Sequence, residues 1–137
     1  MQGRVKMTEV RVVCETVNRN VIEVRQHRVV SDQPAECGGT NQGMTPTELF
    51  LGSLGSCIGV YAAHYCRNHR LEYAGIEIRV TGETSDDAPK RITSIQVRLK
   101  TPRPIPDQLR EGLLSTARRC LIHNTLAERP EIEIGLE

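Results

Sequence analysis

The alternation of hydrophobic and polar residues divides the chain into strand-like and helix-like segments. β-Branched residues dominate 8–17 and 20–30, with Asn18-Arg19-Asn20 between them, which predicts a β-hairpin. Strict alternation in 74–84 and 91–101 predicts two half-buried antiparallel strands joined by a turn. Alternation returns in 131–136 and predicts a short final strand.

The segment 45–69 has the pattern of a long helix without a polar face. Thr45, Pro46 and Glu48 form a capping box at its start. No Asp, Glu, Lys or Arg occurs from Leu49 to Cys66, so we expect the helix to be buried around its whole circumference. Its length would also allow a membrane span, but the soluble β-structure predicted around it argues against one. A symmetric dimer in which this helix packs against its twin would cover it.

A second helix is predicted from Pro106-Asp107 to about Leu121, and residues 123–128 add a possible further turn. The element order β-β-α-β-β-α-β defines an α+β protein with a long buried central helix. The length of 137 residues suits a single domain over 1–137.

Composition narrows the possible partners and the compartment. Lys and Arg number 18 and Asp and Glu 17, for a net charge of +1, and the chain has one Phe, three Tyr and no Trp. These values favour neither nucleic acid nor an acidic membrane as partner. The N-terminus has no signal-peptide pattern, so we expect a cytoplasmic protein whose five cysteines are reduced.

Two of the cysteines are candidates for chemistry. Cys57 lies in mid-helix among glycines and serines, where an inert buried thiol is the alternative interpretation. Cys120 lies near the predicted end of the second helix, where the negative end of the dipole would raise its pKa and favour a resolving role. His123 is within local reach of Cys120, although a capping or surface histidine is the alternative.

The other candidate residues are weaker. Cys66 falls on the opposite helix face from Cys57, and Cys14 and Cys37 have no partner pattern. We expect His64 to be a buried, hydrogen-bonded histidine. A zinc site built from Cys57, Cys120, His64 and His123 has suitable residue types, but the spacing matches no metal-ligand motif, so no metal is predicted.

Two segments resemble the motifs of one known family. Around Cys57 the chain reads Gly-Met-Thr-Pro-Thr-Glu-Leu-Phe-Leu-Gly-Ser-Leu-Gly-Ser-Cys, which resembles the active-site helix of the OsmC/Ohr family. Around Cys120 it reads Arg-Arg-Cys-Leu-Ile-His-Asn-Thr-Leu, which resembles the family's second cysteine motif, although Leu121 replaces the usual Pro. The resemblance covers nearly the whole chain.

The resemblance implies an intertwined homodimer with peroxidase activity. Cys57 would attack a hydroperoxide as a thiolate and become a sulfenic acid, and Cys120 would condense with it to a disulfide. A small dithiol or lipoyl-type reductant would restore both thiols, without a bound cofactor. Organic hydroperoxides are the expected substrates.

The family's organic-hydroperoxide branch activates its cysteine with a Glu and an Arg. The Glu aligns with Thr47 here, and Glu48 follows one position later, so Glu48 is either a catalytic partner or a helix cap. Arg25 and Arg28 are the candidate arginines, together with Arg19. The pattern from His27 to Pro34 occurs in a less characterised branch. The alternative function is a redox-sensing or small apolar ligand-binding protein without efficient turnover.

Overall fold

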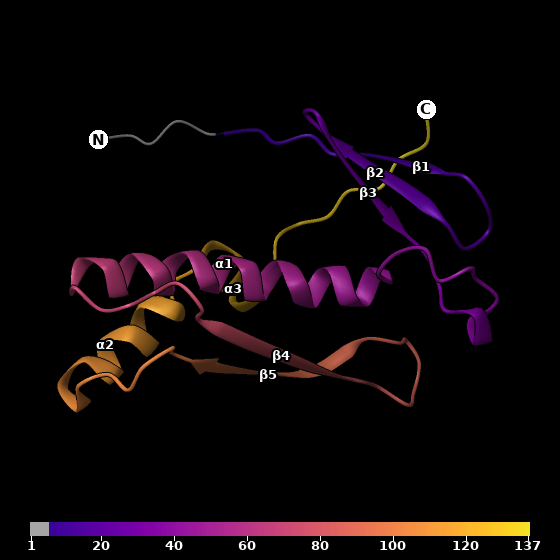
Figure 1. Ribbon diagram of the computed structural model, residues 1–137. Helices are drawn as coiled ribbons and strands as arrows, with labels where there is room; N and C mark the ends of the chain where they lie inside the picture. The colour runs from indigo at the N-terminus through magenta and orange to yellow at the C-terminus, as the bar shows by residue number, and fades with distance from the viewer. Residues whose placement is uncertain (1–5) are drawn as a thin grey trace. The chain divides into compact units, whose positions relative to one another are not determined.

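The computed structural model describes residues 6–137 and confirms the α+β class (Figure 1). The chain forms two compact units, one extending to Phe50 and the other from Leu51 to Glu137. The elements in chain order are β1 (Arg11–Cys14), β2 (Asn20–Val24), β3 (His27–Ser31), the 3-10 helix η1 (Ala35–Cys37), α1 (Pro46–Asn68), β4 (Glu77–Thr84), β5 (Ile92–Lys100), α2 (Asp107–Ala117) and α3 (Leu121–Ala127).

The N-terminal unit is built on the antiparallel sheet β1-β2-β3. The prediction of one strand over 20–30 was wrong, because the chain reverses between Val24 and His27, which pair with each other. Arg25 has a φ of 51° and supplies the left-handed residue that a two-residue hairpin needs. Such a turn normally shows itself as Asn-Gly or Asp-Gly, so Arg25-Gln26 gave no sequence signal.

A buried carboxylate orders the loop that follows β3. Asp32 is 1% exposed and accepts hydrogen bonds from the Thr40 hydroxyl at 2.6 Å and from three backbone N–H groups, those of Gln33, Thr40 and Gln42. The Thr40 hydroxyl and these N–H groups together lower the pKa of Asp32 to about 2, against the opposing effect of burial. The segment between β3 and α1 is therefore a defined structure without strands, in which η1 is one turn.

The C-terminal unit packs α1 along the β4–β5 hairpin, with α2 and α3 beside the middle and C-terminal half of α1 (Figure 1). A stripe at helical spacing makes the buried face of α1, namely Leu54, Ile58, Ala62 and Cys66. Glycines allow the hairpin to come close, since a Cβ at Gly55 would lie 3.0 Å from Val80 Cγ2 and one at Gly59 3.3 Å from Ile78 Cδ1.

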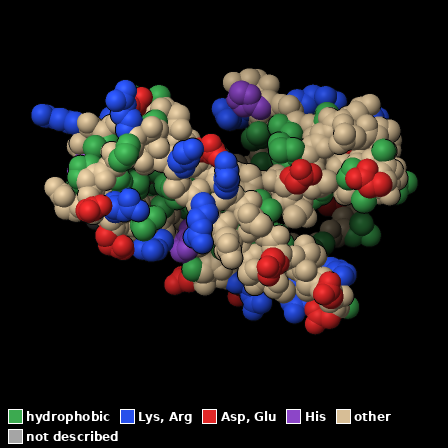
Figure 2. Space-filling model, turned by 60° about the horizontal axis from the view of Figure 1, so that its bottom comes forward, with side chains coloured by type: hydrophobic (Ala, Val, Ile, Leu, Met, Phe, Trp, Pro, Cys, Tyr) green, Lys and Arg blue, Asp and Glu red, His purple; other side chains and the backbone are tan. Residues whose placement is uncertain are grey.

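Within one chain α1 is buried along this stripe but not around its whole circumference. Val60 is 55% exposed, and Gly52 and Ser56 also lie on the open side. The face of the molecule seen in Figure 2 carries hydrophobic side chains among basic and acidic ones. Among the described helices α1 is the one whose length and composition would allow it to cross a membrane, but its packing in the core of an α+β unit gives it a different role.

The predicted second helix is broken. α2 ends at Ala117, and the chain becomes extended at Cys120, with φ −66° and ψ 152°, before α3 begins at Leu121. The Asn124 side chain donates a hydrogen bond to Arg119 O at 3.2 Å, which satisfies one carbonyl at the break. The interruption contains neither Gly nor Pro, so the sequence pattern continued through it.

The final strand predicted over 131–136 does not form. These residues have no regular structure in the chain, and Ile132, Ile134 and Leu136 are 78%, 92% and 101% exposed. Alternation alone does not make a strand, because the backbone groups also need a neighbouring strand.

Candidate functional site

The fold brings Cys57 and Cys120 together in the C-terminal unit. Cys120 belongs to a buried cluster with Leu54, Ile58 and Ala117, and Cys57 packs against that cluster. Both thiols are free, and they lie close enough for the Cys57 thiol to raise the pKa of Cys120. α1 supplies Cys57 and the junction between α2 and α3 supplies Cys120, so the pair lies between two helical segments that pack on the same hairpin.

The surroundings of the two thiols differ. Cys120 is 0% exposed, whereas Cys57 is only half-buried. Burial raises the pKa of Cys120; the Cys57 thiol raises it further, while the N–H group of His123 opposes the shift. Cys57 is therefore the thiol that an external reagent reaches first.

The expected reason for the raised pKa of Cys120 was wrong. Cys120 is not at the C-terminus of α2 but is the N-cap of α3, where its Sγ accepts a hydrogen bond from the His123 N–H at 3.3 Å. A helix N-terminus favours a thiolate. The pKa is raised nevertheless, because burial outweighs the hydrogen bond.

The other three cysteines lie apart from this pair. Cys66 belongs to a second buried cluster with Ala62 and Leu113, and burial raises its pKa. Cys14 and Cys37 are exposed in the N-terminal unit.

A tyrosine that the sequence analysis did not single out joins α1 to α2. The Tyr65 hydroxyl donates to Leu109 O at 3.0 Å, and its ring stacks on His69 at a centroid distance of 4.1 Å. Gly112 faces this ring so closely that a Cβ there would lie 2.9 Å from Tyr65 Cζ. Because α2 leads directly to Cys120, this contact helps to fix the position of the second thiol.

Glu48 acts as a helix cap. Its carboxylate accepts from the Thr45 N–H at 3.0 Å, and its own N–H donates to the Thr45 hydroxyl at 3.2 Å. The predicted capping box is confirmed, and these bonds to Thr45 lower the pKa of Glu48. A catalytic role for Glu48 stays a prediction.

The three candidate arginines lie in the N-terminal unit and differ in how firmly they are held. Arg25 is exposed in the β2–β3 turn, and Arg28 is 57% exposed and lies 3.8 Å from Glu15. The Arg19 side chain is only 24% exposed, lies 3.8 Å from Glu15 and donates to Gln42 Oε1 at 3.0 Å. Arg19 is thus the most firmly positioned of the three, and the role of each in activating Cys57 stays a prediction.

The histidines do not form a metal site with the cysteines. His64 is exposed and its Nδ1 lies 2.9 Å from Arg67 Nη2, so the expectation of a buried histidine was wrong. His123 is half-buried. Within residues 6–137, no three His, Cys, Asp or Glu side chains converge as metal ligands.

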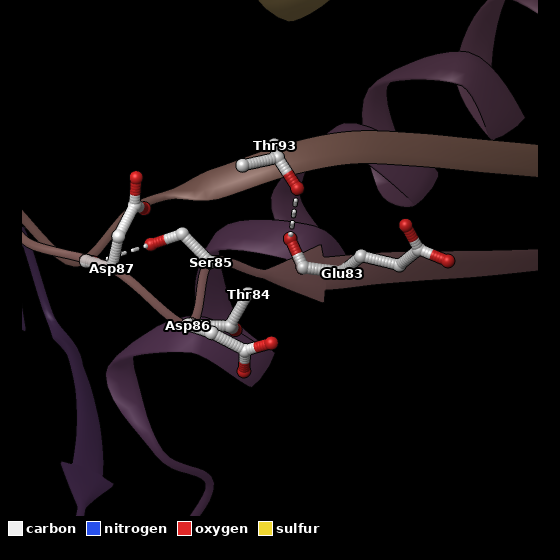
Figure 3. A pocket seen from close by; sticks show the side chains of 6 residues that line it. All are labelled: Glu83, Thr84, Ser85, Asp86, Asp87 and Thr93. Atoms are coloured by element: carbon white, nitrogen blue, oxygen red, sulfur yellow. Dashed lines mark hydrogen bonds between the residues drawn. The ribbon is translucent and has the colours of Figure 1, made fainter.

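An open hollow of about 630 Å³ lies at the tip of the β4–β5 hairpin, and no cysteine lines it (Figure 3). Its lining residues are Glu83, Thr84, Ser85, Asp86, Asp87 and Thr93. Ser85 Oγ donates to Asp87 O at 3.1 Å and Thr93 Oγ1 to Glu83 O at 3.3 Å, so these hydroxyls hold the turn together. The carboxylates in Figure 3 do not converge on a common point.

The fold and the cysteine pair define a small α+β protein with two adjacent thiols on helices that pack on one hairpin. The family model described as OsmC-like protein matches residues 39–135. The chain therefore belongs to the OsmC-like protein family, as its resemblance in sequence implied.

Solved structures share this fold. A protein from Psychrobacter arcticus described in terms of osmotic stress and detoxification has 23% identity and a TM-score of 0.78, over 91% of this chain and 90% of the other. An OsmC-like protein from Mycoplasma pneumoniae has 18% identity and a TM-score of 0.75, over 90% and 89%. An organic hydroperoxide resistance protein from Legionella pneumophila has 12% identity and a TM-score of 0.69, over 92% and 93%. Comparison with curated protein sequences found no match.

Proposed function

We propose that the protein is a thiol-dependent hydroperoxide reductase that uses Cys57 as the peroxidatic and Cys120 as the resolving cysteine. The observation that carries the proposal is that the fold brings these two thiols, 63 residues apart in the sequence (120 − 57), together at one buried cluster. They lie close enough there for the Cys57 thiol to raise the pKa of Cys120. Membership of the OsmC-like family, which includes organic hydroperoxide resistance proteins, supports the substrate class.

The reaction follows from the different exposure of the two thiols. The Cys57 thiolate attacks one peroxide oxygen, the O–O bond breaks, and a sulfenic acid and an alkoxide form; the alkoxide takes a proton to become the alcohol. Cys120 then attacks the Cys57 sulfur, forming the disulfide and releasing water. A small dithiol or lipoyl-type reductant reduces this disulfide by thiol–disulfide exchange, so no bound cofactor is required.

The side chains around the pair favour organic hydroperoxides over hydrogen peroxide. Hydrophobic residues of both strands and of α3 pack around the cluster that contains Cys120, including Val80, Val97 and Ile122. An alkyl or aryl group gains free energy by leaving water for such surroundings, about 25 cal/mol for each Å² of apolar surface buried. Hydrogen peroxide has no such group.

The deciding experiment treats the reduced protein with one equivalent of cumene hydroperoxide and follows its intact mass, with peptide mapping. We expect the loss of two hydrogen atoms, mapped to a Cys57–Cys120 disulfide. Cys57→Ser should abolish peroxide consumption, and Cys120→Ser should allow one turnover followed by further oxidation of Cys57. Cys66→Ser is the matched control and should behave as the parent protein, because Cys66 lies in the other buried cluster.

A redox-sensing or ligand-binding role is the second candidate, favoured by the engagement of Glu48 in the capping box rather than with a thiol. If peroxide left the mass unchanged, or added oxygen slowly to all five cysteines, the reductase proposal would be wrong and this second role would take its place.

We also propose that the protein is a homodimer. The open side of α1 carries the exposed Val60, and the apolar side chains of 131–136 are exposed as well, so a single chain leaves large hydrophobic surfaces in water. Light scattering after gel filtration should give the mass of two chains, and Val60→Asp should shift it toward one. Leu114→Asp is a control at a 40% exposed position on α2. A monomer at micromolar concentration would contradict this proposal.

A further inference from the structure

The aromatic residue nearest in sequence to Cys57 is Tyr61, one helical turn away on α1. Side chains four residues apart lie on the same helix face, with Cβ atoms about 5–6 Å apart. Tyr61 is half-buried and packs against the same cluster of Leu54, Ile58, Ala117 and Cys120 that Cys57 contacts. Its ring is therefore part of the surroundings of the thiol pair.

The hydroxyl group of Tyr61 differs from that of Tyr65 on the next turn. Tyr65 donates to Leu109 O at 3.0 Å and joins two helices. The Tyr61 hydroxyl makes no hydrogen bond within the part of the chain that the structure describes. The hydroxyl oxygen is not one of the fully buried atoms that lack a hydrogen-bond partner. Solvent or a substrate can therefore reach it.

We infer that the Tyr61 hydroxyl donates a hydrogen bond to the hydroperoxide that reacts at Cys57. This inference rests on the proposed reductase function and assigns a residue to substrate recognition and leaving-group stabilisation. A bound hydroperoxide would displace water from this hydroxyl, and the apolar side chains beside the ring would then strengthen the hydrogen bond.

The chemistry gives this donor a specific task. The Cys57 thiolate gives an electron pair to the terminal peroxide oxygen, and the S–O bond forms as the O–O bond breaks. Sulfur is oxidised by two electrons, the terminal oxygen keeps its proton in the sulfenic acid, and the other oxygen leaves as an alkoxide. Tyr61 stabilises this alkoxide and passes it a proton, which the phenolate regains from water. Donors placed where negative charge develops act mainly on the transition state.

Tyr61→Phe tests the inference, because it removes the hydroxyl and keeps the ring. In stopped-flow measurements with cumene hydroperoxide, we expect the second-order rate constant for Cys57 oxidation to fall about tenfold or more. The rate of Cys57 with a small aromatic disulfide should stay the same, since that reaction has a thiolate rather than an alkoxide as leaving group. The melting temperature should also stay the same.

Tyr65→Phe is the matched control. It removes a hydroxyl that is hydrogen-bonded to Leu109 O, so we expect the melting temperature to fall by about 3 °C and the peroxide rate to change little. Equal peroxide rates for parent and Tyr61→Phe, or an equal fall with both reagents, would overturn the assignment while leaving the reductase function standing. A parent protein that reacts with the disulfide but with no hydroperoxide would overturn both.

Discussion

Replacing Gly112 by Ala would change the stability of the protein in two opposite directions, because Gly112 lies in a helix and also faces the ring of Tyr65. Gly112 lies inside α2, where replacing Gly by Ala in an unobstructed helix stabilises by about 1 kcal/mol. Here the new Cβ would lie 2.9 Å from Tyr65 Cζ and 3.1 Å from Cε2, so the ring must move. Overpacking costs about 1–3 kcal/mol. Loss of the hydrogen bond to Leu109 O adds about 1 kcal/mol. Gly112→Ala should therefore destabilise by about 1–3 kcal/mol.

The assay is urea denaturation followed by circular dichroism, with the free energy of unfolding compared between variants. A double-mutant cycle with Tyr65→Phe isolates the hydroxyl, and Gly112→Ala should cost about 1 kcal/mol less in that background. Ser115→Gly and Ser115→Ala, at an exposed position on the same helix, give the unobstructed difference between Gly and Ala. If Gly112→Ala stabilised the protein as much as the Ser115 pair indicates, the close contact with Tyr65 would be refuted. Slower disulfide formation in Gly112→Ala would link this contact to the position of Cys120.

Two further predictions follow from the pKa shifts. Because the pKa of Asp32 is lowered from 3.8 to about 2, its contribution to stability is present above about pH 4 and is lost as the pH falls through about 2. Asp32→Asn should remove this part of the pH dependence of the melting temperature. Identical slopes of melting temperature against pH for parent and variant between pH 4 and 2 would contradict the prediction. Burial raises the pKa of Cys66, so iodoacetamide at pH 8 should label Cys66 only after denaturation. The exposed Cys14 and Cys37 should react in the native protein. Rapid labelling of Cys66 in the native protein, read by peptide mapping, would contradict this prediction and show that its cluster opens.

The sequence predicted α1 well because local interactions define its start. The helix was expected over 45–69 and spans Pro46–Asn68, and the capping box of Thr45 and Glu48 has the expected hydrogen bonds. These contacts join residues three positions apart, so they can be read directly from the chain. The alternation in β4 and β5 was similarly informative, because the hairpin covers one face of α1.

The β2–β3 turn and the break between α2 and α3 were harder to predict, because no Gly, Pro or Asn in the local sequence marks either of them. Arg25 adopts a left-handed conformation that is uncommon for its residue type, and the extended backbone at Cys120 follows no Gly or Pro. At Cys120 the break exchanges helical hydrogen bonds for burial of the thiol and a cap on α3. That exchange depends on α1 and the hairpin, which lie far away in sequence.

The candidate site could be predicted only in part. The resemblance of two motifs selected Cys57 and Cys120, and the structure places both at one buried cluster. Gly112 carried no signal, because a helix-interior glycine is explained only by the ring that it faces. Tyr61 and Tyr65 look alike in sequence, and only the carbonyl of Leu109 distinguishes a structural hydroxyl from an available one.

The C-terminal segment shows what hydrophobic alternation does and does not determine. Alternation in 131–136 specifies two faces, but a strand also needs a neighbour to accept its N–H groups and cover its apolar side. Ile132 and Ile134 remain exposed in the single chain, as does Val60 on α1, which the same patterning argument assigned to a buried helix. The strand prediction for 131–136 was wrong for the single chain, whereas the covering of α1 was expected to need a second copy of the chain and stays a prediction. The dimer proposed above would cover the exposed side chains at both places without any change in the sequence argument.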